Sequence, residues 1–248
     1  MAKSPGSPKS SKSPKSPTSP NRLLASLRPA DRALLRPHLE TVALDQEAVL
    51  FDAGEVIDRV YFPHSGIISL VVVLESGQAI EAAMIGRDSM VGASSALDGV
   101  VSLNTAIVQL AGSGETLDVA RFREIAEKRP DFRTALVRHE QALFAQAQQS
   151  AACNASHIVG ARLSRWLLRA RDLSGSDMLP LTQEFLAQML GVQRSSVSPV
   201  AHTLQQAGLI RYSRGRIEIL NLEGLRDASC ECYGTVKAHY DRLLNGQS

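Results

Sequence analysis

The chain of 248 residues has few of the features that define several large classes of protein. Its three cysteines are too few for a disulfide framework and suit a reducing compartment, so a cytoplasmic location is expected. No run approaches the roughly 18 apolar residues of a membrane-spanning helix, and no membrane partner is expected. The sequence also lacks a nucleophile elbow, a Walker loop and paired catalytic carboxylates, so we do not expect an enzyme.

What the chain does contain is an uneven distribution of charge behind a net formal charge of +2. Residues 41–120 hold eleven acidic side chains and two arginines, a local charge of −9. Residues 1–20 carry four lysines, seven serines and five prolines, with no acid. Such a segment cannot bury enough surface to offset the entropy of ordering, so we expect a disordered tail. It is interpreted as a solvated spacer, with a DNA-contacting basic arm or a set of Ser-Pro phosphorylation sites as alternatives.

Two periodicities divide the rest of the chain. Within residues 41–120, Gly-containing turns separate short β-branched runs at 60–62, 67–74 and 105–110. This spacing is typical of a β-sandwich or a barrel-like roll. From 119 to about 173 the pattern is helical, with a weak point at 154–156. The run at 131–152 is long and favours packing against a second copy of itself, with packing along its own β domain as the alternative.

The most specific pattern lies between residues 181 and 220. Thr182 is a suitable helix N-cap, and Gly191 follows the predicted helix as a tight turn requires. A second helix begins near Gln193 with one apolar stripe, formed by Val197, Val200, Ala201 and Leu204. Its opposite face is small and polar, as entry into a DNA major groove requires. An alternating segment folded at 214–215 then predicts a hairpin with three arginines near its tip, suited to contact phosphates.

The run 182–197, TQEFLAQMLGVQRSSV, resembles the winged helix-turn-helix of Crp/Fnr-type bacterial transcription regulators. Residues 161–168 resemble the preceding helix, while Gly54-Glu55 and the YFPHSG run at 61–66 resemble the family's cyclic-nucleotide-binding-like β-roll. The resemblance implies an α+β fold with an N-terminal double-stranded β-roll of the cupin or jelly-roll type. The expected divisions are a disordered tail (1–20), a sensor domain (21–130), a dimerisation helix (131–153), a winged helix-turn-helix DNA-binding domain (154–235) and a C-terminal tail (236–248).

The resemblance further implies a sequence-specific regulator that binds a pseudo-palindromic double-stranded DNA site as a homodimer, with RNA polymerase as a candidate partner. Arg194 falls on the family's base-contacting arginine, whose guanidinium can pair with guanine. Pro199 stands where many members carry a further arginine, and it removes a backbone donor inside the helix. The candidate DNA contacts are Thr182, Gln183, Gln193, Arg194, Ser195, Ser196, Ser198, His202, Arg211, Arg214 and Arg216. Because of Pro199, the alternative is a ligand- or protein-binding β-roll module with weakened DNA binding.

The cassette that holds a cyclic phosphate in nucleotide-binding relatives is degenerate here. The matching residues are Gly92, Ala93, Asn104 and Thr105, so the family's glutamate and arginine are both missing. Without that arginine a phosphate would enter a strongly acidic domain, which opposes binding. We therefore expect no dependence on cyclic AMP, and Arg87 is left open as a substitute.

Metal cofactors are not expected either. An iron–sulfur cluster needs four ligands, usually cysteines, and the chain has only Cys153, Cys230 and Cys232, none in the N-terminal part where the family's cluster cysteines lie. Cys230 and Cys232 are interpreted as two ordinary helical cysteines, with half a metal site or a redox pair as the alternatives. The histidines show no typical ligand spacing at His38, His64, His139 and His157.

Overall fold

The computed structural model describes residues 19–245, and the N-terminal tail expected from the sequence lies outside the described residues up to position 18. The helices and 3-10 turns are α1 (Arg22–Ser26), α2 (Pro29–Leu35), η1 (Arg36–His38), η2 (Ala93–Leu97), α3 (Val119–Lys128), α4 (Pro130–Ser156), α5 (Val159–Ser174), α6 (Gln183–Leu190), α7 (Arg194–Gln206), α8 (Leu222–Asp227) and α9 (Cys232–Leu244). The strands are β1 (Glu40–Leu44), β2 (Val49–Phe51), β3 (Arg59–Pro63), β4 (Ile67–Val73), β5 (Ala79–Ile85), β6 (Thr105–Leu110), β7 (Gly112–Asp118), β8 (Met178–Leu179), β9 (Ile210–Ser213) and β10 (Arg216–Ile219).

The N-terminal strands form a β-roll, as the spacing of β-branched runs predicts. Two antiparallel sheets have the strand orders β1-β7-β3 and β2-β6-β4-β5. The three runs expected from the sequence correspond to β3, β4 and β6. Their inward side chains, among them Val60, Phe62 and Val108, belong to a core that also includes Phe122 of α3 and Phe132 of α4. This core fixes the start of the long helix on the roll.

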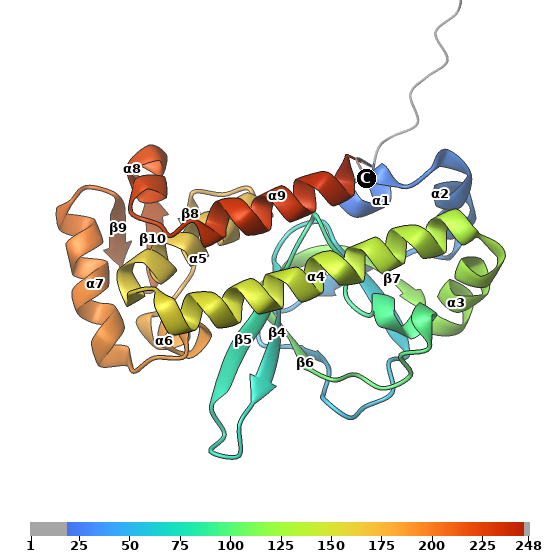
Figure 1. Cartoon of the computed structure of the whole chain (residues 1–248), viewed down its shortest axis with the longest axis horizontal. Helices are drawn as coiled ribbons and strands as arrows, with labels where there is room; N and C mark the ends of the chain where they lie inside the picture. Colours follow the sequence, from blue (N-terminus) through green and yellow to red (C-terminus); the bar gives the residue numbers. More distant parts are fainter. Residues whose placement is uncertain (1–18, 246–248) are drawn as a thin grey trace, which may run out of the picture.

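The long helix α4 has 27 residues and runs along the roll to the helices of the C-terminal part in Figure 1. It ends at His157, whose backbone is extended, so the break falls slightly after the weak point expected at 154–156. The C-terminal segment differs from the tail expected at 236–248, because residues up to Leu244 form α9, which packs beside α4. Val236 and Tyr240, one helical turn apart, are buried there with Ala142 of α4.

The two halves of the molecule share one hydrophobic cluster. It contains Ile67 and Val71 of β4 and Met84 of β5, together with Trp166 of α5 and the inward faces of α6 and α7. The helix-turn-helix end therefore packs directly on the β4–β5 side of the roll. No helix in the described part of the chain is long and apolar enough to cross a membrane.

Candidate DNA-binding surface and sensor cavity

Helix α6 and the turn after it are fixed by local contacts that the sequence predicts. The Thr182 hydroxyl accepts from the Phe185 N–H at 3.1 Å and caps the helix. Gly191 has a φ of +61°, a left-handed conformation that favours glycine and ends α6. Arg162 of α5 donates to the Leu190 carbonyl at the same end. These contacts set the angle at which α7 leaves the turn.

Helix α7 presents the polar face expected of a recognition helix. Val197, Ala201 and Leu204 are buried, whereas the other side is open to solvent. The exposed candidate contacts on α7 and at its N-terminus are Gln193, Arg194, Ser195, Ser196 and His202, while Ser198 is half-buried. The Ser198 hydroxyl donates to the side-chain oxygen of Gln183, which joins the two helices.

Pro199 does not interrupt α7, which is continuous from Arg194 to Gln206. Pro199 lies on the exposed face, as does Ser195, whose carbonyl receives no backbone donor from position 199. The Thr203 hydroxyl donates to the Pro199 carbonyl at 3.0 Å.

The hairpin after α7 is the predicted wing. Strands β9 and β10 pair antiparallel, and Arg214 and Gly215 at the turn both have positive φ. All three arginines of the wing are exposed. Arg211 is held by Glu218 at 2.6 Å, whereas no ion pair is found for Arg214 or Arg216 within the described residues.

The sensor end contains a cavity of about 470 Å³ between the roll and α4. Its lining is mostly apolar, with Phe51, Ile85 and Met90 among its side chains. The charged residues that line it, within the described part of the chain, are Asp98 and Glu140, and both are acidic.

The degenerate cassette forms one wall of this cavity. Gly92 and Asn104 line it, and Gly92 has a φ of +87° at the start of η2. Ala93 is buried, and the Thr105 hydroxyl accepts from the Ala53 N–H at 3.3 Å. Arg87 is not a substitute for the missing arginine. It lies on another side of the roll, in a polar depression with Arg22 and Arg169.

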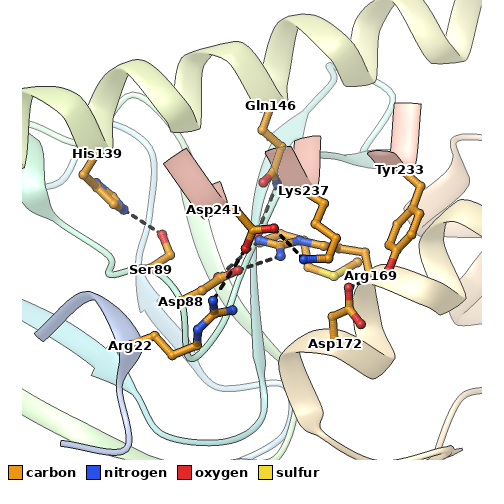
Figure 2. Close-up of polar contacts among 11 residues, drawn as sticks. Arg22, Asp88, Ser89, His139, Gln146, Arg169, Asp172, Tyr233, Lys237 and Asp241 are labelled. Atoms are coloured by element: carbon orange, nitrogen blue, oxygen red, sulfur yellow. Dashed lines mark hydrogen bonds and ion pairs between the residues drawn. The ribbon is translucent and has the colours of Figure 1, made fainter. Parts of the chain in front are cut away.

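A buried polar network joins the roll to the helices (Figure 2). Asp88, just after β5, accepts from both terminal nitrogens of Arg169 of α5, at 2.7 and 3.2 Å, and both side chains are buried. The Arg169 guanidinium lies 4.6 Å from the centre of the Tyr240 ring of α9. The Tyr233 hydroxyl of α9 donates a hydrogen bond to Asp172 of α5. Burial and this hydrogen bond raise the pKa of Tyr233 to about 12, so the hydroxyl is protonated at physiological pH.

Two side chains of α4 also form hydrogen bonds with the roll (Figure 2). The fully buried His139 accepts at Nε2 from the Ser89 hydroxyl at 2.6 Å and from the Met90 N–H at 3.3 Å. Gln146 donates to the Met84 carbonyl at 3.1 Å. Met90 also lines the cavity, so the wall of the cavity is attached directly to α4.

A buried carboxyl lies where β5 contacts α5. Glu81 accepts from the Trp166 indole at 2.9 Å and from the Ser69 hydroxyl. Burial raises the pKa of Glu81, and the hydrogen bond from Ser69 offsets part of this effect. The interface between the two halves therefore contains an acid that is costly to ionise.

The structure brings together four residues that the sequence patterns treat separately. Cys153 and His157 are one turn apart at the end of α4, and Cys230 and Cys232 flank the start of α9. Their sulfur and nitrogen ligand atoms all lie within 4.8 Å of one another. The interpretation of two ordinary helical cysteines is wrong for Cys230, which precedes α9. The sequence signal for this cluster is the spacing of four positions between Cys153 and His157. The spacings between the histidines alone do not reveal it.

Two family models match separate parts of the chain. The model of the cyclic nucleotide-binding domain matches residues 41–129, and that of the Crp-like helix-turn-helix domain matches residues 161–228. Over 209 residues the chain is 27% identical to the transcriptional regulator SdrP of Thermus thermophilus, a match that covers 73% of this chain and 94% of that protein. It is 24% identical over 208 residues to the global nitrogen regulator of a Synechocystis strain, covering 80% and 92% of the two chains.

The fold agrees with that of a solved Crp/Fnr-family transcriptional regulator, also from Thermus thermophilus. The TM-score is 0.63 at 25% identity, over 77% of this chain and 98% of the other. The β-roll, the long helix and the winged helix-turn-helix together define a two-domain, DNA-binding transcription regulator. The chain belongs to the Crp/Fnr family.

Proposed function

We propose that the protein regulates transcription as a homodimer whose two α7 helices enter successive major grooves of a pseudo-palindromic DNA site. The observation that carries this proposal is the open polar face of α7, with Arg194 at its N-terminus and the exposed wing arginines beside it. A helix in this position reads base edges with its first turns, while the wing contacts phosphates.

The surface of α4 supports the homodimer. Exposed residues recur along it at alternating spacings of four and three, at Val137, Gln141, Phe144, Gln148, Ala151 and Ala155. Phe144 is 65% exposed and Val137 40%, so two large apolar side chains lie open on this one face of the helix. The spacing is that of the seam of a two-stranded coiled coil, so a second copy of α4 is the natural partner. We call this row of residues the α4 stripe.

The ligand of the sensor cavity follows from its lining. A cyclic nucleotide would place a phosphate near Asp98 and Glu140, with no cation to neutralise it among the described residues of the lining. The cavity fits a neutral or cationic, largely apolar small molecule instead. Glu140 and Leu143 of α4 line the cavity next to Phe144, so an occupant would touch the helix that carries the α4 stripe.

Duplex DNA binding tests this function. Sites are selected from a random DNA library with the full-length protein, and affinity is measured by fluorescence anisotropy over a range of salt concentrations. Arg194→Ala should cost about 1–3 kcal/mol, or roughly 5- to 150-fold in affinity, and relax one base position. The matched control is Arg36→Ala. Arg36 is an exposed arginine of η1, distant in sequence from Arg194.

Two outcomes would speak against the proposal. Binding that does not respond to salt or to Arg194→Ala would exclude recognition through this surface, because phosphate contacts make log affinity fall with log salt. A gain of DNA binding in Pro199→Val would instead favour the alternative of a module with weakened DNA binding.

A further inference from the structure

Four potential metal ligands converge where the long helix ends. Cys153 and Cys232 are fully buried, Cys230 is nearly so, and the His157 side chain is about one quarter exposed. The sulfurs of Cys153 and Cys230 are 3.5 Å apart, and Nδ1 of His157 lies 3.6 Å from the Cys232 sulfur. Three thiols and an imidazole facing one point form a donor set that binds metal ions.

The distances match a single tetrahedral ion. Bonds of about 2.3 Å to sulfur and 2.0–2.1 Å to nitrogen place two ligand sulfurs about 3.8 Å apart and a sulfur and a nitrogen about 3.6 Å apart. A cluster of two or four irons would divide the ligands among different irons and so spread the ligand atoms farther than the 4.8 Å found here. The Cys153–Cys230 and Cys232–His157 distances are already close to those around one ion, and the other pairs, at most 4.8 Å apart, need to close by no more than about 1 Å.

We propose that Cys153, His157, Cys230 and Cys232 bind one thiophilic divalent metal ion, for which Zn²⁺ is the best match. A Cys₃His set with four protein ligands is characteristic of a closed, structural zinc site. Soft thiolate ligands favour Zn²⁺ over Mg²⁺, Ca²⁺ or Mn²⁺, which prefer oxygen.

Contacts around the four residues support the assignment. The Nε2 atom of His157 lies 3.3 Å from the carboxylate of Glu231, so the ring presents Nδ1 to the sulfurs. A carboxylate on the second nitrogen is the usual partner of a metal-binding histidine. Gln149 of α4 donates to the Cys232 sulfur at 3.0 Å, as expected beside a thiolate. Arg165 of α5 is close enough for its charge to act on Cys153, and it would balance the negative charge of a zinc tris-thiolate.

The position of the site gives the ion a structural consequence. It connects the end of α4 to the α8–α9 connection and to the first residue of α9. His157 and Ile158 link α4 to α5, so the ion is placed where the DNA-binding domain joins the long helix. Loading the site fixes this junction and attaches α9 to α4 at the end opposite the β-roll.

Metal content of the full-length protein is the direct test. Protein purified with a non-thiol reductant and without chelator should contain about one zinc per chain by mass spectrometry. Protein stripped of metal under the same reducing conditions should then bind about one equivalent of Co²⁺, with the visible and near-ultraviolet bands of tetrahedral cobalt–thiolate. Added Zn²⁺ should remove these bands.

Variants identify the ligands. Cys232→Ser and His157→Ala should lose the stoichiometric ion, whereas His157→Cys should retain it through four thiolates. Glu231→Gln should weaken zinc binding about 10- to 100-fold without abolishing it. His38→Gln, at an exposed histidine outside the cluster, is the control and should bind metal normally. If Cys232→Ser does not fold, the His157 variants decide, because that side chain is partly exposed.

Three results would overturn the proposal. The first is stripped, reduced protein that gives no cobalt–thiolate spectrum at stoichiometric metal. The second is iron accompanied by acid-labile sulfide in place of zinc. The third is protein isolated without reductant that contains no metal and a disulfide between Cys153 and Cys230.

Discussion

The DNA-binding surface and the sensor cavity of this protein meet opposite physical demands. The α7–wing surface is exposed, polar and carries four arginines, Arg194, Arg211, Arg214 and Arg216. The cavity is concave, apolar and lined by two acids. DNA presents the same groove shape and phosphate charge to every binder, so a surface that reads it has few chemical solutions. A cavity has to match only its own ligand, and here the cavity of a roll that matches the cyclic nucleotide-binding domain is lined by two acids.

The largest effect is expected on α4, which lines the cavity and leads into the DNA-binding domain. Phe144→Glu places a charge at the centre of the α4 stripe, facing its own copy in the proposed dimer. Loss of the dimer removes the gain of binding two half-sites together, so affinity for a full site should fall about 10²- to 10⁴-fold. Sedimentation velocity and fluorescence anisotropy measure both effects.

A matched control is Leu34→Glu, at an exposed leucine of α2. It should leave both the dimer and DNA affinity intact. A Phe144→Glu protein that stays dimeric would place the dimer interface away from the α4 stripe.

A smaller effect is expected within the wing. Arg216→Ala should weaken binding to all DNA sequences by a similar factor and reduce the salt slope by about one. Arg211→Ala should have less effect, because the Arg211 guanidinium is already held by Glu218. Equal salt slopes for the two variants would mean that the ion pair opens when DNA binds.

The buried acid at the domain interface predicts a pH dependence. The folded protein binds the Glu81 proton more tightly than the unfolded chain does, because burial raises the pKa of this carboxyl. Its contribution to stability is therefore complete below the ordinary pKa of glutamate and is lost as pH rises through the raised pKa. Glu81→Gln should remove this loss, so the Tm of the variant should rise relative to that of the wild type as the pH increases above the ordinary pKa of glutamate. The control is the exposed Glu75→Gln, which should follow the wild type.

The smallest expected effect is the response to cyclic AMP, which should be absent. A ligand present at 100 times its Kd adds about 2.7 kcal/mol to stability, enough to shift Tm by several degrees. Cyclic AMP at millimolar concentration should leave the Tm of the wild type unchanged. Asn104→Arg places a cation at the cavity and should increase affinity for the nucleotide, whereas Asn104→Gln should not. A clear shift in the wild type would refute the argument from the acidic lining.

Local patterns predict the DNA-binding half well, because its determinants are close in sequence. The cap at Thr182, the turn at Gly191 and the buried stripe of α7 each depend on residues within one or two turns. The three strands at β3, β4 and β6 are likewise found from β-branched runs. How these helices and strands are arranged in space is implied by the family resemblance.

Features that depend on distant partners are not predicted. Helix α9 buries Cys232, Val236 and Tyr240, and the burial of Val236 and Tyr240 depends on α4. The metal-ligand cluster needs Cys153 and Cys230 in contact, which are 77 positions apart. Glu140 is an ordinary helical acid in the sequence and becomes part of the cavity only when α4 crosses the roll. In each case the contact is made by tertiary packing, which the spacing of residues along the sequence does not indicate.

The hydrophobic cluster shared by β4, β5 and the helices of the DNA-binding domain has a consequence for unfolding. Part of the core of that domain is supplied by the roll, through Ile67, Val71 and Met84. Separating the two halves would expose this apolar surface on both, at a cost proportional to its area. We therefore expect the roll and the helix-turn-helix to melt in a single cooperative transition, and a fragment cut at His157 to be prone to aggregation.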